Sequence, residues 1–148
     1  MSKTITSVQK AYLAGFLDGD GSIYVRAKAN SSYKYGFQIA PSVILFQSAK
    51  DKENFLKVCN LIGLGYVRER NDGILEYTMN RKEAILKFLQ LIRPYVIMKA
   101  EQVKLITRIL VLKERVSTRQ DFRELMIVVD RFRELNYSKK RKKHILTP

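Results

Sequence analysis

Residues 12–21 read YLAGFLDGDG, an apolar helical pattern that ends in two carboxylates. Ala11, Gly15 and Gly19 recur every four residues around this stretch, so they share one side of a helix. Small side chains at that spacing let the backbone of a second helix come close. The stretch therefore predicts a helix that packs on another helix through its small residues.

Asp18 and Asp20 fall at the C-terminal end of this helix, where the helix dipole disfavours an anion. A divalent cation would compensate their charge, and hard oxygen ligands suit Mg²⁺, Mn²⁺ or Ca²⁺. A plain polar turn is the alternative, but it leaves the small-residue helix unexplained. An EF-hand does not fit, because its sixth and twelfth positions would be Ile23 and Ala29. The pattern favours a metal site.

The composition indicates a polyanionic partner. The chain has 148 residues, of which 46% are hydrophobic, which is enough for one domain with a real core. Its 28 Lys and Arg residues outnumber 14 Asp and Glu, which gives a net charge of +14. Nucleic acid is the first partner to consider, although a basic ribosomal protein has the same balance.

Several classes of protein are excluded by what the chain lacks. Cys59 is the only cysteine, so no intrachain disulfide forms, and its apolar helical setting predicts a buried thiol. His144 is the only histidine, which excludes zinc sites built on several histidines. The chain shows neither a membrane-spanning apolar run nor a signal peptide core. We therefore expect an intracellular, soluble protein of the cytoplasm or an organelle.

The hydrophobic periodicity predicts an α+β fold with the order α-β-β-α-β-β-α, followed by two more helices. We expect a four-stranded antiparallel sheet with helices on one face. One domain is expected over residues 1–137 and a basic tail over 138–148. Ser7 and Thr118 are expected to cap the first and the last helix, and the helices are expected at about 7–18, 50–62, 80–93, 99–115 and from 118 on. The strands are expected at 22–30, 37–47, 66–70 and 74–79, with Pro41 at a bulge or an edge of the second strand.

One face of the expected sheet carries polar and basic side chains. In residues 22–30, for example, Arg26 and Lys28 alternate with apolar neighbours. Arg can read guanine, Gln and Asn can read adenine, and Lys binds phosphate. Such a face is often merely solvated, but the net charge favours nucleic-acid contact.

The motif at residues 13–21, LAGFLDGDG, resembles the signature of the LAGLIDADG homing endonucleases along its whole length. Residues 63–68, GLGYVR, and the basic strands resemble the single-motif, homodimeric branch. The resemblance implies a sheet that lies over the DNA major groove. It also implies a site-specific endonuclease that makes a staggered double-strand break in a long, partly palindromic DNA target by divalent-metal-dependent hydrolysis. The alternative is a non-catalytic nucleic-acid-binding protein on the same fold, either an intron-splicing maturase or a transcriptional regulator; Asp20 favours the enzyme.

The resemblance also implies roles for individual residues. Asp20 and the backbone carbonyl of Gly19 would coordinate the metal, Mg²⁺ first, with Mn²⁺ or Ca²⁺ able to take the same site. Gln47 matches a polar family residue near the attacking water, and Lys99 matches a lysine beside the scissile phosphate. A further basic residue is common in the family, but the aligned place within residues 50–52 holds an aspartate between two lysines, so this member stays open.

One motif per chain supplies one such carboxylate, whereas metal-dependent hydrolysis of a phosphodiester calls for at least two acidic groups. A two-fold dimer packed helix on helix would bring two Asp20 side chains together, so we expect a homodimer on double-stranded DNA. The expected interface residues are Ala11, Tyr12, Ala14, Gly15 and Asp18. The expected DNA contacts are Tyr24, Arg26, Lys28, Asn30, Ser32, Gln38, Ser42, Tyr66, Arg68, Arg70, Glu76 and Thr78.

Overall fold

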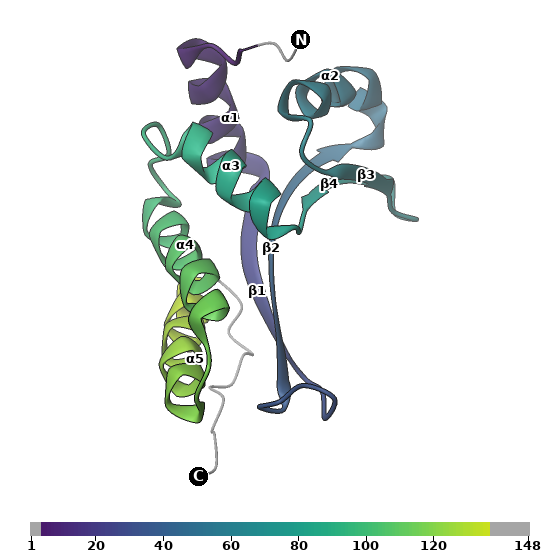
Figure 1. Ribbon diagram of the computed structural model, residues 1–148. Helices are drawn as coiled ribbons and strands as arrows, with labels where there is room; N and C mark the ends of the chain where they lie inside the picture. The colour runs from purple at the N-terminus through teal and green to yellow at the C-terminus, as the bar shows by residue number, and fades with distance from the viewer. Residues whose placement is uncertain (1–3, 137–148) are drawn as a thin grey trace. The chain divides into compact units, whose positions relative to one another are not determined.

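The computed structural model of the chain describes residues 4–136, and its elements follow the expected order (Figure 1). Four strands form one sheet in the order β1-β2-β4-β3, and β4 pairs antiparallel with both of its neighbours. This confirms the α+β fold. The elements are α1 (Ser7–Asp20), β1 (Gly21–Ala29), β2 (Phe37–Ser48), a 3-10 turn η1 (Ala49–Asp51), α2 (Lys52–Ile62), β3 (Tyr66–Glu69), β4 (Ile74–Met79), α3 (Lys82–Ile92), α4 (Ala100–Arg115) and α5 (Arg119–Glu134).

The described chain separates into two compact units, and each is described by itself. The first unit contains residues up to 23 together with 42–100, and the second contains 24–41 together with residues from 101 on. The expected basic tail, 138–148, lies outside the described residues. None of the helices within residues 4–136 is long and apolar enough to cross a membrane.

In the first unit, α1 begins one residue away from the expected cap. Thr6, rather than Ser7, is the N-cap, because Gln9 stands three residues after it and completes a reciprocal pair of hydrogen bonds. The helix also runs on to Asp20, since the N–H of Gly21 still bonds the carbonyl of Leu17. The motif therefore lies on one continuous helix up to Asp20, and its last residue, Gly21, begins β1.

The core of the first unit includes the contact between α1 and α3 (Figure 1), and alternate residues of β4 are buried in the same unit. Full burial of each large apolar side chain contributes about 1.5–3 kcal/mol. Pro41, which belongs to the second unit, is buried in β2 two residues before the pairing with β4 begins at Val43, so a proline without an N–H is tolerated on that side. The buried residues are Leu13, Ala14 and Leu17 of α1, Leu75, Tyr77 and Met79 of β4, and Ala84, Ile85, Phe88, Leu89 and Ile92 of α3.

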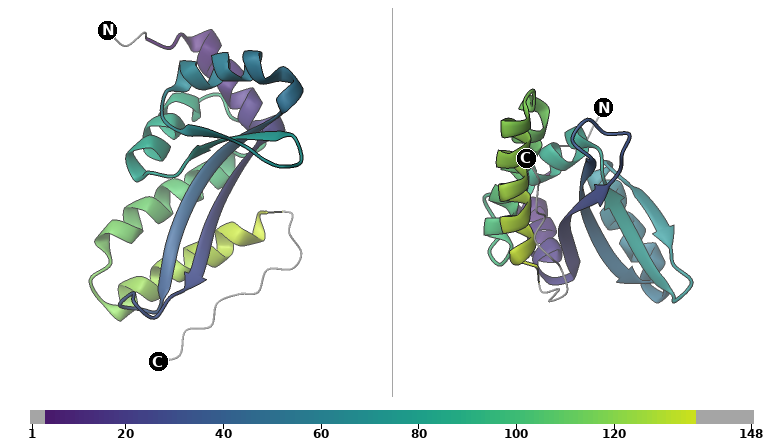
Figure 2. Two further views of the ribbon diagram at one scale, coloured as in Figure 1. Left: turned by 90° about the vertical axis from the view of Figure 1, so that its right-hand side faces the viewer. Right: turned by 90° about the horizontal axis from the view of Figure 1, so that it is seen from below.

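The second unit contains α4 and α5, which lie side by side (Figure 2). Thr118 caps α5 as expected, in a capping box with Asp121. Hydrogen bonds from the Ser117 backbone and hydroxyl and from the Thr118 N–H lower the pKa of the Asp121 carboxyl. Tyr35 stacks on Phe122 of α5, with ring centroids 5.1 Å apart. This stacking holds the loop between β1 and β2 on α5.

A buried phenol fixes the link between α2 and β3 in the first unit. The Tyr77 hydroxyl oxygen accepts the N–H of Leu64 at 2.8 Å and that of Gly65 at 2.7 Å. Burial raises the pKa of Tyr77, so the phenol stays neutral. A side chain at Gly65 would collide with the carbonyl of Thr78, so the link lies directly on β4. Burial likewise raises the pKa of the Cys59 thiol to about 11, which fits the expected inert thiol.

We therefore expect Tyr77→Phe to lower the free energy of unfolding by about 1–3 kcal/mol, because two amides lose their acceptor. Tyr66→Phe is the matched control: Tyr66 is 54% exposed and its hydroxyl makes only a 3.4 Å contact with Asn80. The control should change stability by less than about 0.5 kcal/mol. Urea unfolding followed by circular dichroism measures both, and equal losses would contradict this account.

Candidate functional site

The two carboxylates at the end of α1 have different environments. Asp18 is half-buried, and its carboxylate accepts the backbone N–H groups of Ile97 at 2.8 Å, Met98 at 3.0 Å and Lys99 at 3.1 Å. Asp20 is exposed. The expectation that a cation compensates both carboxylates is therefore wrong for Asp18, because the turn before α4 supplies three amides to it. Only Asp20 remains exposed for a ligand.

Lys99 lies at the same end of α1. Its ammonium donates a 2.9 Å hydrogen bond to the backbone carbonyl of Asp18. The last carbonyls of a helix have no partner within the helix, and a cation there also interacts favourably with the dipole. The Lys99 ammonium therefore binds α1 two residues before Asp20 in the sequence. Its catalytic role stays a prediction.

The other predicted catalytic residue, Gln47, belongs to β2, opposite Leu75 of β4. It is half-buried, and its side-chain oxygen accepts the N–H of Ser48 at 2.9 Å. Among the neighbouring lysines, Lys52 forms an ion pair with Glu69 at 3.3 Å. The third basic member of the site stays unassigned.

The donor set at the end of α1 suits a hard divalent cation but is incomplete. Asp20 offers one carboxylate and Gly19 one backbone carbonyl, and both residues are exposed. Within residues 4–136, no three His, Cys, Asp or Glu side chains gather into a potential metal site. Mg²⁺ is commonly held by one or two carboxylates together with water and substrate phosphates. The residues therefore fit such an ion, with water and substrate phosphates as the further ligands that it would take.

One face of α1 is exposed and carries small or apolar side chains. A methyl group added at Gly15 or Gly19 would meet no atom within 4 Å, so nothing in this chain requires glycine there. Each glycine inside a helix costs about 1 kcal/mol relative to alanine. We name this surface the α1 face; it consists of Val8, which is 80% exposed, Ala11, Tyr12, which is 55% exposed, Gly15 and Gly19.

The structure separates two residues from this face that the sequence had assigned to the interface. Ala14 is fully buried in the core of its own chain, so its side chain does not reach the exposed face. The Asp18 carboxylate is bound to its own backbone, as described above. Helical spacing alone did not reveal either constraint, because both come from segments distant in the sequence.

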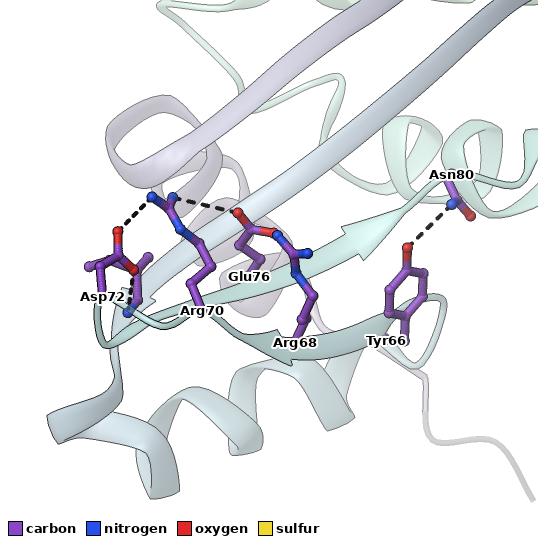
Figure 3. Close-up of polar contacts among 7 residues, drawn as sticks. Tyr66, Arg68, Arg70, Asp72, Glu76 and Asn80 are labelled. Carbon is purple, nitrogen blue, oxygen red and sulfur yellow. Dashed lines mark hydrogen bonds and ion pairs between the residues drawn. The ribbon is translucent and has the colours of Figure 1, made fainter.

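The β3–β4 hairpin carries a network of charges on one face (Figure 3). Arg68 lies opposite Glu76 in the register, and the two form an ion pair at 3.1 Å. Arg70 contacts Glu76 at 3.5 Å and Asp72 at 2.6 Å. Arg68 and Glu76 thus share one face of the hairpin. Asp72 was not among the site residues predicted from the sequence, although an aspartate two residues after an arginine is a signal for such a pair.

Two hydroxyls expected on the same face are almost covered. Thr78 and Ser42 are each only 8% exposed. Thr78 lies between Ile44 of β2 and Tyr66 of β3, which cover it from both sides. Period-two alternation places a residue on a face of the sheet but does not report how far its neighbours cover it.

In the second unit, β1 alternates as expected. Val25 is fully buried, whereas Arg26 and Lys28 are exposed. The Asn30 side-chain oxygen accepts both the N–H and the hydroxyl of Ser32, at 3.0 Å and 2.6 Å, which orients both side chains. The other predicted contacts here, Tyr24 and Gln38, are half-buried.

Comparison with known proteins adds independent findings. The family model for the LAGLIDADG endonuclease matches residues 13–112. DNA endonuclease I-CreI of Chlamydomonas reinhardtii is 34% identical over 132 residues, which cover 88% of this chain and 80% of the relative. DNA endonuclease I-CvuI of Chlorella vulgaris is 30% identical over 131 residues, covering 88% and 81%. A crystal structure of I-CvuI with the I-CreI target and 2 mM Mg, its DNA not cleaved, matches with a TM-score of 0.84 at 29% identity, over 91% of this chain and 86% of that one.

The different environments of the two carboxylates lead to a prediction about stability. Asp18→Asn should lower the free energy of unfolding by about 1–3 kcal/mol, because an amide offers one acceptor oxygen and places a donor against the three amides. Asp20→Asn is the matched control and should change stability by less than about 0.5 kcal/mol. Both are measured by urea unfolding with EDTA present. Equal effects would show that Asp18 does not brace the turn.

Proposed function

Because this chain belongs to the LAGLIDADG endonuclease family, we propose that it is a site-specific homing endonuclease that makes a staggered double-strand break in a long, partly palindromic DNA target. The observation that carries the proposal is the exposed Asp20 at the end of α1, two residues after the Asp18 carbonyl that the Lys99 ammonium binds. Asp18 is used by the fold, so the sequence keeps a second carboxylate where the fold does not need one. A carboxylate in that position suits metal-dependent hydrolysis.

Each residue at this end of α1 has a distinct role in the proposal. Asp20 and the carbonyl of Gly19 hold a divalent ion, Mg²⁺ in the first instance, which when bound stabilises developing negative charge and lowers the pKa of water. Lys99 offsets the extra charge on the scissile phosphate, and its hydrogen bond to the Asp18 carbonyl fixes where the ammonium lies. Gln47 orients the attacking water.

The incomplete donor set supports a homodimer. A second chain packed on the α1 face would bring a second Asp20 to the same place, and the two-fold symmetry would make the interface isologous. Ile97 and Met98, 81% and 75% exposed, add apolar surface beside the Asp18 end of the helix. The α1 face contains three residues of the predicted interface, Ala11, Tyr12 and Gly15.

Two pairs of neighbouring strands, β1 with β2 and β3 with β4, supply the proposed DNA contacts. A two-stranded ribbon fits the major groove, where an arginine can bind guanine through two hydrogen bonds. In the first unit, Arg68 and Arg70 are the strongest candidates for base contacts. In the second unit, Arg26 and Lys28 are exposed, and Asn30 is oriented by Ser32. A half-site of roughly 10 bp per chain follows from two-fold symmetry on B-form DNA.

Asp20→Asn should abolish cleavage and leave binding intact, because the amide keeps the shape of the side chain but does not balance a divalent charge. The substrate is a set of DNA duplexes that the wild-type protein selects and cuts from a randomised library in Mg²⁺. Single-turnover cleavage at saturating protein should fall by orders of magnitude, with affinity changed only slightly. Glu124→Gln, an exposed carboxylate on α5, is the control and should cut normally. Wild-type-like cleavage by Asp20→Asn would refute the assignment.

The dimer is tested separately with Gly15→Leu. The single chain has room for a larger side chain at Gly15, so the variant should fold, but the leucine would keep two α1 helices apart. Sedimentation velocity at micromolar concentration should show a dimer for the wild type and a monomer for the variant. Gln90→Leu adds the same apolar group at an exposed position of α3 and should remain dimeric. A monomeric wild type, with and without DNA, would contradict the proposal.

A further inference from the structure

We propose that Asp72 is a specificity-determining residue: it holds the Arg70 guanidinium in one orientation, so that Arg70 discriminates a base pair instead of binding any phosphate. This inference rests on the proposed function, because it explains how one residue of the DNA-binding hairpin gains selectivity. Asp72 itself need not touch DNA. It acts as a positioning residue through Arg70.

The turn between β3 and β4 fixes Asp72 firmly. One carboxylate oxygen accepts the N–H of Ile74 at 3.2 Å, and the other accepts a terminal N–H of Arg70 at 2.6 Å. The Arg70 backbone is fixed as well, because its N–H bonds the Ile74 carbonyl at 2.8 Å and its carbonyl accepts the N–H of Gly73 at 3.1 Å. Gly73 has a φ of +82°, which a glycine adopts without strain. The carboxylate and the arginine thus start from one rigid turn.

The second terminal nitrogen of Arg70 is held from the opposite side. It lies 3.5 Å from Glu76, whose side chain is only 14% exposed and is also paired with Arg68 at 3.1 Å. Figure 3 shows Arg70 between the two carboxylates. A guanidinium has five N–H donors, so two contacts leave donors on both terminal nitrogens. Arg70 can therefore keep both carboxylates and still donate to a base.

The sign of the charges supports a role in selectivity. The chain carries +14 overall, yet beside Arg68 and Arg70 on one face of this hairpin lie two carboxylates, Asp72 and Glu76. Carboxylates weaken the attraction to phosphate, which supplies most non-specific affinity. A surface that served only affinity for DNA would bind more tightly without these carboxylates. A fixed guanidinium, in contrast, loses less conformational entropy when it forms two hydrogen bonds to guanine.

The same hairpin offers a matched control. Glu69 forms a comparable exposed ion pair with Lys52 at 3.3 Å, and their side chains are 50% and 54% exposed. Glu69 lies opposite Leu75 in the register, so its side chain is on the other face of the hairpin from Arg68 and Glu76. Glu69→Gln therefore removes one negative charge from the hairpin without touching Arg70.

The test measures base preference at every position of the half-site. All variants carry Asp20→Asn, so that DNA is bound without being cut, and binding is selected from a library of randomised duplexes. Arg70→Ala should relax the preference at one defined base pair. Asp72→Asn keeps an oxygen for the turn and should weaken that same preference by about fivefold, the lower end of what one bidentate contact supplies. Glu69→Gln should leave it unchanged.

Two results would overturn the inference: an intact preference at that base pair in Asp72→Asn, or a change in affinity that is equal for all sequences, as the loss of one negative charge alone would cause. The double variant Arg70→Ala/Asp72→Asn should lose no further preference at that base pair, because both changes act through one contact. Normal preferences elsewhere show that the variant is folded. A parent protein that selects no sequence would refute the proposed function as well, whereas a selective parent with an indifferent Asp72→Asn refutes only this inference.

Discussion

The hydrogen bonds that Lys99 and its turn donate to Asp18 are the constraint on which the C-terminal end of α1 depends. The Asp18 carboxylate accepts three amides of the turn before α4, and the Lys99 ammonium returns a bond to the Asp18 carbonyl. Each partner satisfies backbone groups that the end of a helix or a turn would otherwise leave unpaired. Because Asp18 is used in this way, Asp20 alone is presented outward.

The surfaces of the first unit carry features that the single chain does not use. Gly15 and Gly19 weaken α1 and fill no crowded place within the chain, and Tyr12 stays largely exposed beside them. A lone exposed carboxylate at Asp20 offers too few ligands for a divalent ion. A second copy of the chain that covered α1 and brought its own Asp20 would account for both features.

On the β3–β4 hairpin, in contrast to α1, the charged side chains already pair with one another within the chain. Arg68 and Arg70 are paired with Glu76 and Asp72 rather than left free for phosphate. Partly exposed ion pairs of this kind add little to stability, commonly under about 1 kcal/mol. In the proposal made above, they serve to fix the direction of the guanidinium groups for sequence-selective binding.

The sequence by itself determined the order of the elements, the α+β class and the alternation in β1 and β4, because these follow from local periodicity. Through the motif and the resemblance that it carries, the sequence also predicts roles for Asp20 and Lys99. Only the tertiary structure decided that Asp18 braces a turn some 80 residues away, that Ala14 belongs to the core and that Thr78 is covered by its neighbours. Periodicity reports which side of an element a residue occupies. What lies against that side depends on contacts between distant segments, which no local pattern contains.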